Sequence, residues 1–131
     1  MTPTAGAFAP GDVLPHFTVR TIEGATFAYS TIWQLRNLVL VALTDEDAAR
    51  AYADSLHPHT LEFASRNAVL VVTRDPVRGL PAPAVVVADR WGEIIHVATP
   101  SAVSDLPSAT ALLGWLDFLE QRCPECEGEA R

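Results

Sequence analysis

Short aliphatic runs alternate along the chain with stretches whose apolar residues recur at helical spacing. The runs at 38–43, 68–73 and 84–88 consist almost entirely of valine, leucine and alanine. An uninterrupted apolar run of this length is typical of a strand that is buried on both faces, as in parallel or mixed sheets. The pattern therefore predicts three central strands.

Weaker strand signals stand on either side of these runs. Residues 17–20 and 26–29 are short β-prone segments separated by Glu23-Gly24, which predicts a hairpin. Residues 93–98 follow the turn Asp89-Arg90-Trp91-Gly92 and are expected to return as an antiparallel strand. The two kinds of pairing together predict a mixed sheet.

Two further segments are expected to be helical. The hydroxyl of Ser30 can accept from free amides of a first turn, which predicts a short helix from Ser30 to Leu35. Residues 108–122 predict an amphipathic helix, because three leucines recur on one face: Leu112, Leu116 and Leu119.

The longest helical signal lies between the first two aliphatic runs. Thr44 is expected to cap it, and the carboxylates of residues 45–47 favour the positive end of a helix. Pro58 interrupts the segment 45–66, so we expect either a kinked helix or two helices. Its buried stripe consists of Tyr52, Leu56 and Phe63.

The order of these elements predicts an α/β fold, with a mixed β-sheet, flanking helices and a single domain. The 131 residues suffice for one domain with its own core. Residues 1–10 read as a flexible arm, residues 11–122 as the domain and residues 123–131 as a C-terminal tail.

Charge and hydropathy exclude several classes of partner. Nine arginines and no lysine stand against 16 acidic residues, for a net charge of −7, which disfavours binding to nucleic acid or to anionic membranes. The aliphatic run 38–43 is much shorter than the ~20 residues that cross a bilayer. No secretion signal is recognisable at the N-terminus, so the sequence predicts a cytoplasmic protein in a reducing compartment.

Two motifs resemble the peroxiredoxin branch of the thioredoxin-like superfamily. Gly11-Asp12-Val13-Leu14-Pro15-His16-Phe17 is similar to the G-x-x-x-P-x-F opening of that branch. The segment from Pro83 to Glu93 is similar to the place where those folds have a cis-proline, a strand and a D-x-x-G turn. The resemblance covers roughly residues 10–120 and implies a thioredoxin-like fold with a redox function.

The resemblance also implies an active site at the start of the helix that follows the first central strand. A cysteine there would be activated by free amides and the helix dipole. The matching residues 44–50 contain no cysteine and carry three carboxylates, so the usual peroxidatic cysteine is missing. Thr44 and Pro83 remain as candidates for a substrate groove, and Arg74 could reach a bound anion. A helix cap and a solvated cation are the simpler interpretations of Thr44 and Arg74.

The two cysteines of the chain form a C-P-E-C motif, Cys123-Pro124-Glu125-Cys126. Redoxin-like sequences that end in a comparable motif strengthen the resemblance. Two residues between thiols permit either a reversible disulfide or two corners of a metal site. The end of a helix and the acidic residues nearby are expected to raise the thiol pKa, which suits a dithiol donor or a resolving pair. We hypothesise cofactor-free exchange with a disulfide or thiol partner, in which either Cys123 or Cys126 attacks. The spacing does not decide between them, and the position of Cys126 nearer the end of the chain favours it as the attacking thiol.

Three other interpretations stay open at this point. The motif resembles the knuckle of rubredoxins and zinc ribbons, so a homodimer could share zinc or iron, or His96 or His57-Pro58-His59 could complete a site. The fold could serve as a non-catalytic binding module with its groove beside Pro83. The motif could also be an inert tail. The tryptophans, Trp33, Trp91 and Trp115, are interpreted as packing residues.

Overall fold

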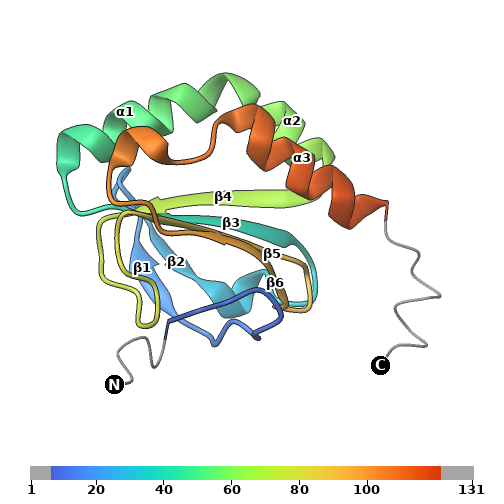
Figure 1. Cartoon of the computed structure of the whole chain (residues 1–131). Coiled ribbons are helices and arrows are strands. Elements are labelled where there is room, and N and C mark those ends of the chain that lie inside the picture. Colours follow the sequence, from blue (N-terminus) through green and yellow to red (C-terminus); the bar gives the residue numbers. More distant parts are fainter. Residues whose placement is uncertain (1–6, 122–131) are drawn as a thin grey trace.

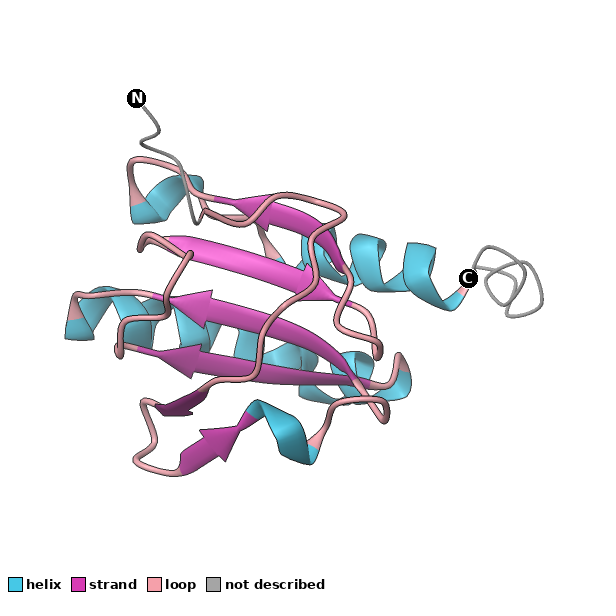
Figure 2. Ribbon diagram, turned by 90° about the horizontal axis from the view of Figure 1, so that it is seen from below, coloured by secondary structure: helices cyan, strands magenta, loops and turns pink. Residues whose placement is uncertain are grey.

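Strand β3 (Asn37–Ala42) lies inside a four-stranded sheet in the computed structural model, which describes residues 7–121. All six of its residues are buried, as the aliphatic run predicts. The strand order is β4 (Ala68–Thr73), β3, β5 (Ala84–Ala88), β6 (Ile94–Ala98). β4 runs parallel to β3, whereas β5 and β6 are antiparallel to their neighbours (Figure 2). The predicted mixed sheet is confirmed.

A separate hairpin is attached to the outer edge of β4. It consists of β1 (Thr18–Arg20) and β2 (Thr26–Ala28), which pair antiparallel around a turn where Gly24 has φ +94°. The N–H of Ile22 donates to the carbonyl of Val72 at 3.0 Å. This bond ties the hairpin to the C-terminal half of β4.

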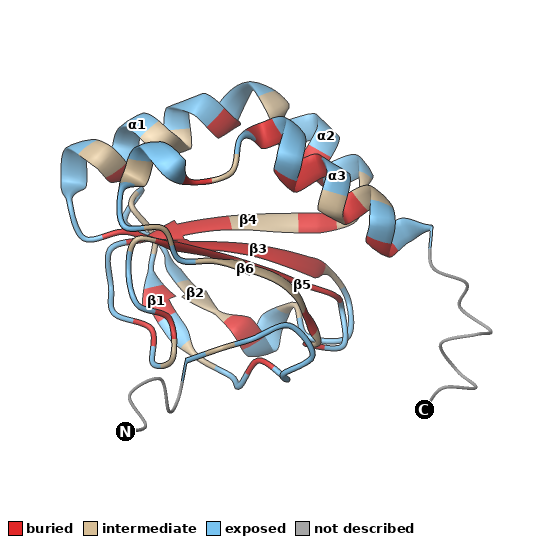
Figure 3. Cartoon of the chain, in the orientation of Figure 1, coloured by how far each residue is buried: buried red, intermediate tan, exposed pale blue. Residues whose placement is uncertain are grey.

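Three α-helices cover one face of the four-stranded sheet (Figure 1): α1 (Glu46–Leu56), α2 (Thr60–Ser65) and α3 (Ala109–Glu120). Their buried residues face the sheet (Figure 3) and include Leu56, Phe63, Leu112, Leu116 and Leu119. Pro58 lies in the 3₁₀ turn η2 (His57–His59) between α1 and α2, so the segment forms two helices. The predicted apolar stripes of both helical regions are confirmed, except that Tyr52 is half-buried at the margin of the core.

The two predicted N-caps in the first half of the chain are wrong. Ser30 lies inside a 3₁₀ turn, η1 (Tyr29–Thr31), and no side chain caps this turn. Helix α1 is capped by Asp45, whose Oδ2 accepts from the N–H of Ala48 at 2.7 Å, and not by Thr44. An aspartate is at least as good an N-cap as a threonine, and the extended backbone at Asp45 places its carboxylate over the first turn. Helix α3 is capped by Ser108, whose Oγ accepts from the N–H of Ala111 at 3.2 Å.

The ends of the chain limit what can be compared with the sequence predictions. Most of the predicted arm and the whole C-P-E-C motif lie outside the described residues, as does Arg122, where the last helix was expected to end. A third 3₁₀ turn, η3 (Val103–Asp105), leads into α3. Between residues 7 and 121, no helix is both long and apolar enough to cross a membrane.

Candidate functional site

Three segments that are distant in the sequence meet where β3 ends. Ala42, the last residue of β3, pairs with Thr73 of β4 on one side and with Ala84 of β5 on the other. The antiparallel register then places Pro83 opposite Leu43. The peptide bond between Ala82 and Pro83 is cis. The start of α1, the end of β4 and the cis-proline loop therefore share one edge of the sheet.

A hollow of about 450 Å³ opens at this edge, and we call it the Thr44 groove. Its apolar lining comes from the end of β3 and from the loop 76–82, and its polar residues gather on one side. The lining residues are Ala42, Leu43, Thr44, Arg74, Asp75, Pro76, Val77, Leu80, Pro81 and Ala82. Leu43, Val77 and Leu80 are themselves buried and make its floor. A groove of this shape can hold an apolar side chain or a short peptide segment.

Charged side chains already occupy the N-terminal end of α1 beside the groove. Asp45 caps the helix, and Glu46 lies within 3.6 Å of Arg50 and 3.7 Å of Arg74, measured between side-chain nitrogen and oxygen atoms. The Nε of Arg74 also donates to the carbonyl of Thr44 at 3.2 Å. A carboxylate therefore takes the place at the positive end of the helix that a thiolate or another anion would use.

The sequence-predicted site residues fall into two groups. Thr44 and Arg74 line the groove and are exposed. Pro83 is half-buried and follows the lining residue Ala82, but it does not line the groove itself. The hydrogen bond from Arg74 to the carbonyl of Thr44 joins the end of β4 to the start of the α1 segment. Cys123 and Cys126 lie outside the described residues, so their place relative to the groove is not part of this geometry.

Sequence reasoning missed the apolar part of the groove and a small hollow next to it. Val77 and Leu80 stand in a proline-rich loop without periodicity, so no pattern marks them as lining residues. The adjoining hollow, of about 220 Å³, lies between the β1–β2 hairpin and α1 and shares Arg74 and Asp75 with the groove. The N–H of Arg20 donates to Asp75 Oδ2 at 2.7 Å. This hydrogen bond connects the hairpin, which lines the smaller hollow, to Asp75, which lines both.

The histidines that could complete a metal site are dispersed. His57 is exposed in η2, and the Nδ1 of His59 contacts Glu62 Oε1 at 2.6 Å. His96 belongs to β6 and stacks on Trp115, with ring centroids 4.5 Å apart. In the described stretch from 7 to 121, no group of three histidines or acidic residues is arranged to hold a metal ion.

Protonation of His96 is expected to destabilise the folded protein. Burial lowers its pKa below the ordinary value near 6.5, whereas the unfolded chain keeps that ordinary value. As the pH falls below about 6.5, the unfolded state takes up the proton first, so the free energy of unfolding decreases until the lowered pKa is passed. Urea unfolding at several pH values should show a smaller decrease in His96→Gln than in the wild type. An equal decrease in both proteins contradicts the assignment.

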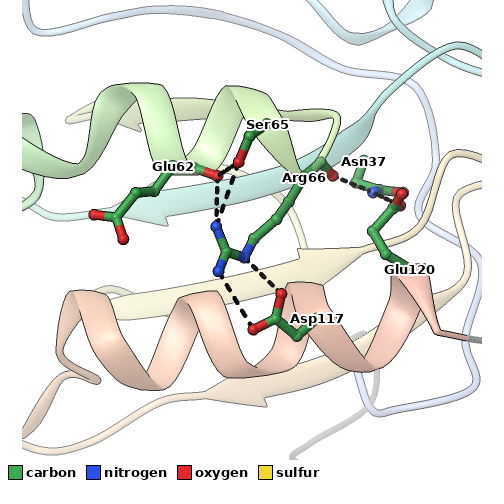
Figure 4. Close-up of polar contacts among 6 residues, drawn as sticks. All are labelled: Asn37, Glu62, Ser65, Arg66, Asp117 and Glu120. Carbon is green, nitrogen blue, oxygen red and sulfur yellow. Dashed lines mark hydrogen bonds and ion pairs between the residues drawn. The ribbon is translucent and has the colours of Figure 1, made fainter.

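The C-terminal end of α3 is fixed at the opposite end of β3 from the groove (Figure 4). The Nδ2 of the buried Asn37, the first residue of β3, donates to Glu120 Oε2 at 3.0 Å. The Nε of Arg66 donates to Asp117 Oδ1 at 2.7 Å, and this contact raises the pKa of the guanidinium. The charge of Asp117 is therefore paired with Arg66, which weakens its effect on the thiols that follow in the sequence.

Comparison with solved structures identifies the architecture. The reduced 2-Cys peroxiredoxin of Plasmodium vivax superposes with a TM-score of 0.68 and 12% identity, over 86% of this chain and 82% of that chain. AhpC of Mycobacterium bovis gives a TM-score of 0.64 and 14% identity, over 90% and 97%. A thiol:disulfide interchange protein of the thioredoxin family from Chlorobium tepidum gives 0.59 and 13%, over 87% and 99%.

The chain has a thioredoxin-like fold. No family model matches the sequence, and no curated protein sequence matches it significantly. At these low identities the likeness establishes the fold, and the chemistry has to be argued from the chain's own residues. The thioredoxin-like fold confirms the expected fold class, and the cis-proline lies where the sequence resemblance places it.

Proposed function

We propose that this chain is a thioredoxin-like redox protein that exchanges thiols and disulfides through Cys123 and Cys126. One observation carries the proposal: residues 7–121, which build the fold, contain no cysteine, and an acidic cap stands at the start of α1. Two structural neighbours with this fold are named as a thiol:disulfide interchange protein and a thiol-disulfide oxidoreductase. In this chain the same fold is followed by one pair of cysteines, Cys123 and Cys126. A peroxidatic cysteine has no place in this arrangement.

The proposed step transfers two electrons from the dithiol to a partner. The thiolate of Cys126 attacks a sulfur of the partner disulfide, which forms a mixed disulfide and releases one partner thiolate. The thiolate of Cys123 then attacks the sulfur of Cys126, which closes the Cys123–Cys126 disulfide and releases the second partner thiol. The partner is reduced and the motif is oxidised. A cellular dithiol of lower reduction potential returns the motif to the reduced state.

The length of the tail separates this chemistry from the Thr44 groove of the same chain. The eight residues from Asn37 to Thr44 span about 23 Å as a strand. The five peptide steps from Gln121 to Cys126 reach at most about 18 Å. We infer that the two thiols do not replace the missing cysteine at α1 within one chain. We therefore expect the exchange to take place on a partner and not in the Thr44 groove of the same chain.

Native mass spectrometry distinguishes this proposal from a metal-bridged dimer. The sample is measured as purified, after mild reduction, and after treatment with a chelator. Thiol–disulfide exchange predicts a metal-free chain that gains the mass of two hydrogen atoms on reduction and is unaffected by the chelator. About one zinc or iron ion per two chains, with dimers that dissociate on chelation, would replace the proposal by the shared metal site.

A second candidate function is favoured by the Thr44 groove itself. Its lining is mostly apolar, it lies beside a cis-proline, and it contains no reactive sulfur, which fits a non-catalytic module that binds a peptide. The two candidates make opposite predictions for a chain that ends at residue 121. The binding module retains its biological activity after this truncation, whereas the redox protein loses it completely.

A further inference from the structure

A third hollow, of about 380 Å³, lies between the outer edge of β4 and the helices α1 and α2. We call it the β4-edge pocket. Its walls are mostly apolar, and polar groups stand at its two ends and at its rim. It is lined by Glu23, Arg36, Ala53, His57, Thr60, Phe63, Ala64, Ala68, Val69, Leu70 and Val72. It shares no residue with the Thr44 groove.

The backbone at this edge leaves little room for an added peptide strand. The carbonyls of Asn67 and Thr73 face β3, because they accept from N–H groups of Asn37 and Leu43. The alternation of strand hydrogen bonds then turns the backbone N–H and C=O groups of Ala68, Leu70 and Val72 away from β3. The N–H of Ile22 already donates to the carbonyl of Val72, and the Nη2 of Arg36 donates to the carbonyl of Ala68 at 3.3 Å. Between these two carbonyls lie only the N–H and C=O of Leu70 and the N–H of Val72, which is too short a stretch for a paired strand. A small ligand therefore fits this edge better than a strand does.

Arg36 supplies a positive charge at one end of the β4-edge pocket. Its Nε is buried and has no hydrogen-bond partner among the described residues. No acidic side chain of the described chain forms an ion pair with it either. The buried Nε is closed to solvent and therefore to a ligand as well, but the guanidinium carries a charge, unpaired within the described chain, at the pocket wall. An anionic oxygen can accept from its outer nitrogens, of which Nη2 already donates to Ala68.

The opposite end of the pocket has the opposite charge. Glu23 follows Ile22, which is bound to Val72 near the C-terminal end of β4, whereas Arg36 is bound to Ala68 at its N-terminal end. The walls between them include the buried Phe63 and the half-buried Leu70. An occupant with a carboxylate at one end and a hydrocarbon body matches this arrangement. A cationic amphiphile would meet Arg36, or in reverse would place its charge at Glu23, which is exposed to solvent and attracts it more weakly.

We propose that the β4-edge pocket binds a small amphipathic carboxylate, with its carboxylate on Arg36 and its hydrocarbon part against Phe63 and Leu70. The carboxylate accepts from the guanidinium as a charge-assisted hydrogen bond, and the apolar walls remove the hydrocarbon from water. This site is independent of the redox proposal, because it uses neither the thiols nor the Thr44 groove.

Titration of the full chain with octanoate, followed by backbone amide NMR, tests the proposal. Octylamine, with the same chain length and the opposite charge, is the matched probe, and both are used below their micellar concentrations. Octanoate is expected to shift the amides of residues 60–64 and 68–72 and to bind about tenfold or more tightly than octylamine. Arg36→Met keeps most of the side-chain volume and is expected to weaken octanoate binding by a similar factor.

A second variant tests the pocket without touching Arg36. Ala64 is exposed and lines the pocket, so Ala64→Trp is expected to obstruct it and abolish the octanoate shifts. Leu61→Trp is the control on the same helix, because Leu61 is 83% exposed and does not line the pocket. Equal binding of octanoate and octylamine, octanoate shifts confined to other residues, or undiminished binding to both Arg36→Met and Ala64→Trp would overturn the proposal.

Discussion

A Cys126→Ser variant is expected to reduce a model disulfide no faster than buffer does. In the proposed step, the sulfur of Cys126 forms the first bond to the partner disulfide, and a serine hydroxyl does not replace a thiolate as nucleophile at neutral pH. Both core clusters are complete packing units within the described residues 7–121, so the circular dichroism spectrum should match that of the wild type. The measurement is the initial rate of disulfide reduction by the pre-reduced protein.

Cys123→Ser is the matched control for this prediction. It keeps the attacking thiol and lacks the resolving one, so it should form a mixed disulfide with the partner and stop there. Mass spectrometry detects this adduct directly. If Cys123→Ser is inactive and Cys126→Ser forms the adduct, the two roles are exchanged. If both variants reduce the disulfide at the wild-type rate, the motif is not the reactive group.

Leu116→Ala is expected to destabilise the fold more than any surface substitution. The side chain of Leu116 is fully buried, in the core cluster that joins α3 to β3 and β5. Removing a buried leucine side chain costs its transfer free energy and leaves a cavity, which together lower the free energy of unfolding by about 2–5 kcal/mol. Urea unfolding followed by far-UV circular dichroism measures the difference.

The control for the core substitution is Leu61→Ala. Leu61 lies on α2 with 83% of its surface exposed, so its truncation should change the free energy of unfolding by less than about 0.5 kcal/mol. Similar losses for Leu61→Ala and Leu116→Ala would mean that α3 does not pack on the sheet as described.

The strands could be predicted well from the sequence because their signal is local and strong. The runs at 68–73 and 84–88 coincide with β4 and β5, since a valine-rich segment without polar interruptions has only the buried interior of a sheet as a stable place. The interruption at Pro58 was predicted as well, because a proline has no N–H to continue the helix, but the choice between a kinked helix and two helices was not.

The predictions that failed depend on choices between adjacent residues. The sequence Thr44-Asp45-Glu46 offers two side chains that could cap α1, and Asp45 has this role while Arg74 engages the carbonyl of Thr44. Arg74 comes from the end of β4, some 30 residues later, so no local pattern could decide the cap. The same holds for Ser30, where the chain turns in a 3₁₀ geometry without a side-chain cap.

The sequence predicted that Thr44 and Pro83 lie near a groove, but it did not predict the apolar residues that shape the groove. Thr44 and Pro83 were recognised by their place in motifs, and the sheet register brings their segments together. The β4-edge pocket had no sequence signal at all. Arg36 is a single arginine between two elements, and only the structure shows that β4 begins beside it, with the Ala68 carbonyl accepting from its Nη2.

The central claim is that the two sulfurs of the C-P-E-C motif carry the electrons. The most direct test mixes the fully reduced chain with one equivalent of a model disulfide, quenches by thiol alkylation, and maps the cysteines by peptide mass spectrometry. The account predicts that Cys123 and Cys126 become a disulfide within the chain, in one-to-one proportion to the model disulfide that is consumed. Recovery of both cysteines as alkylated thiols, with the model disulfide still intact, would contradict it.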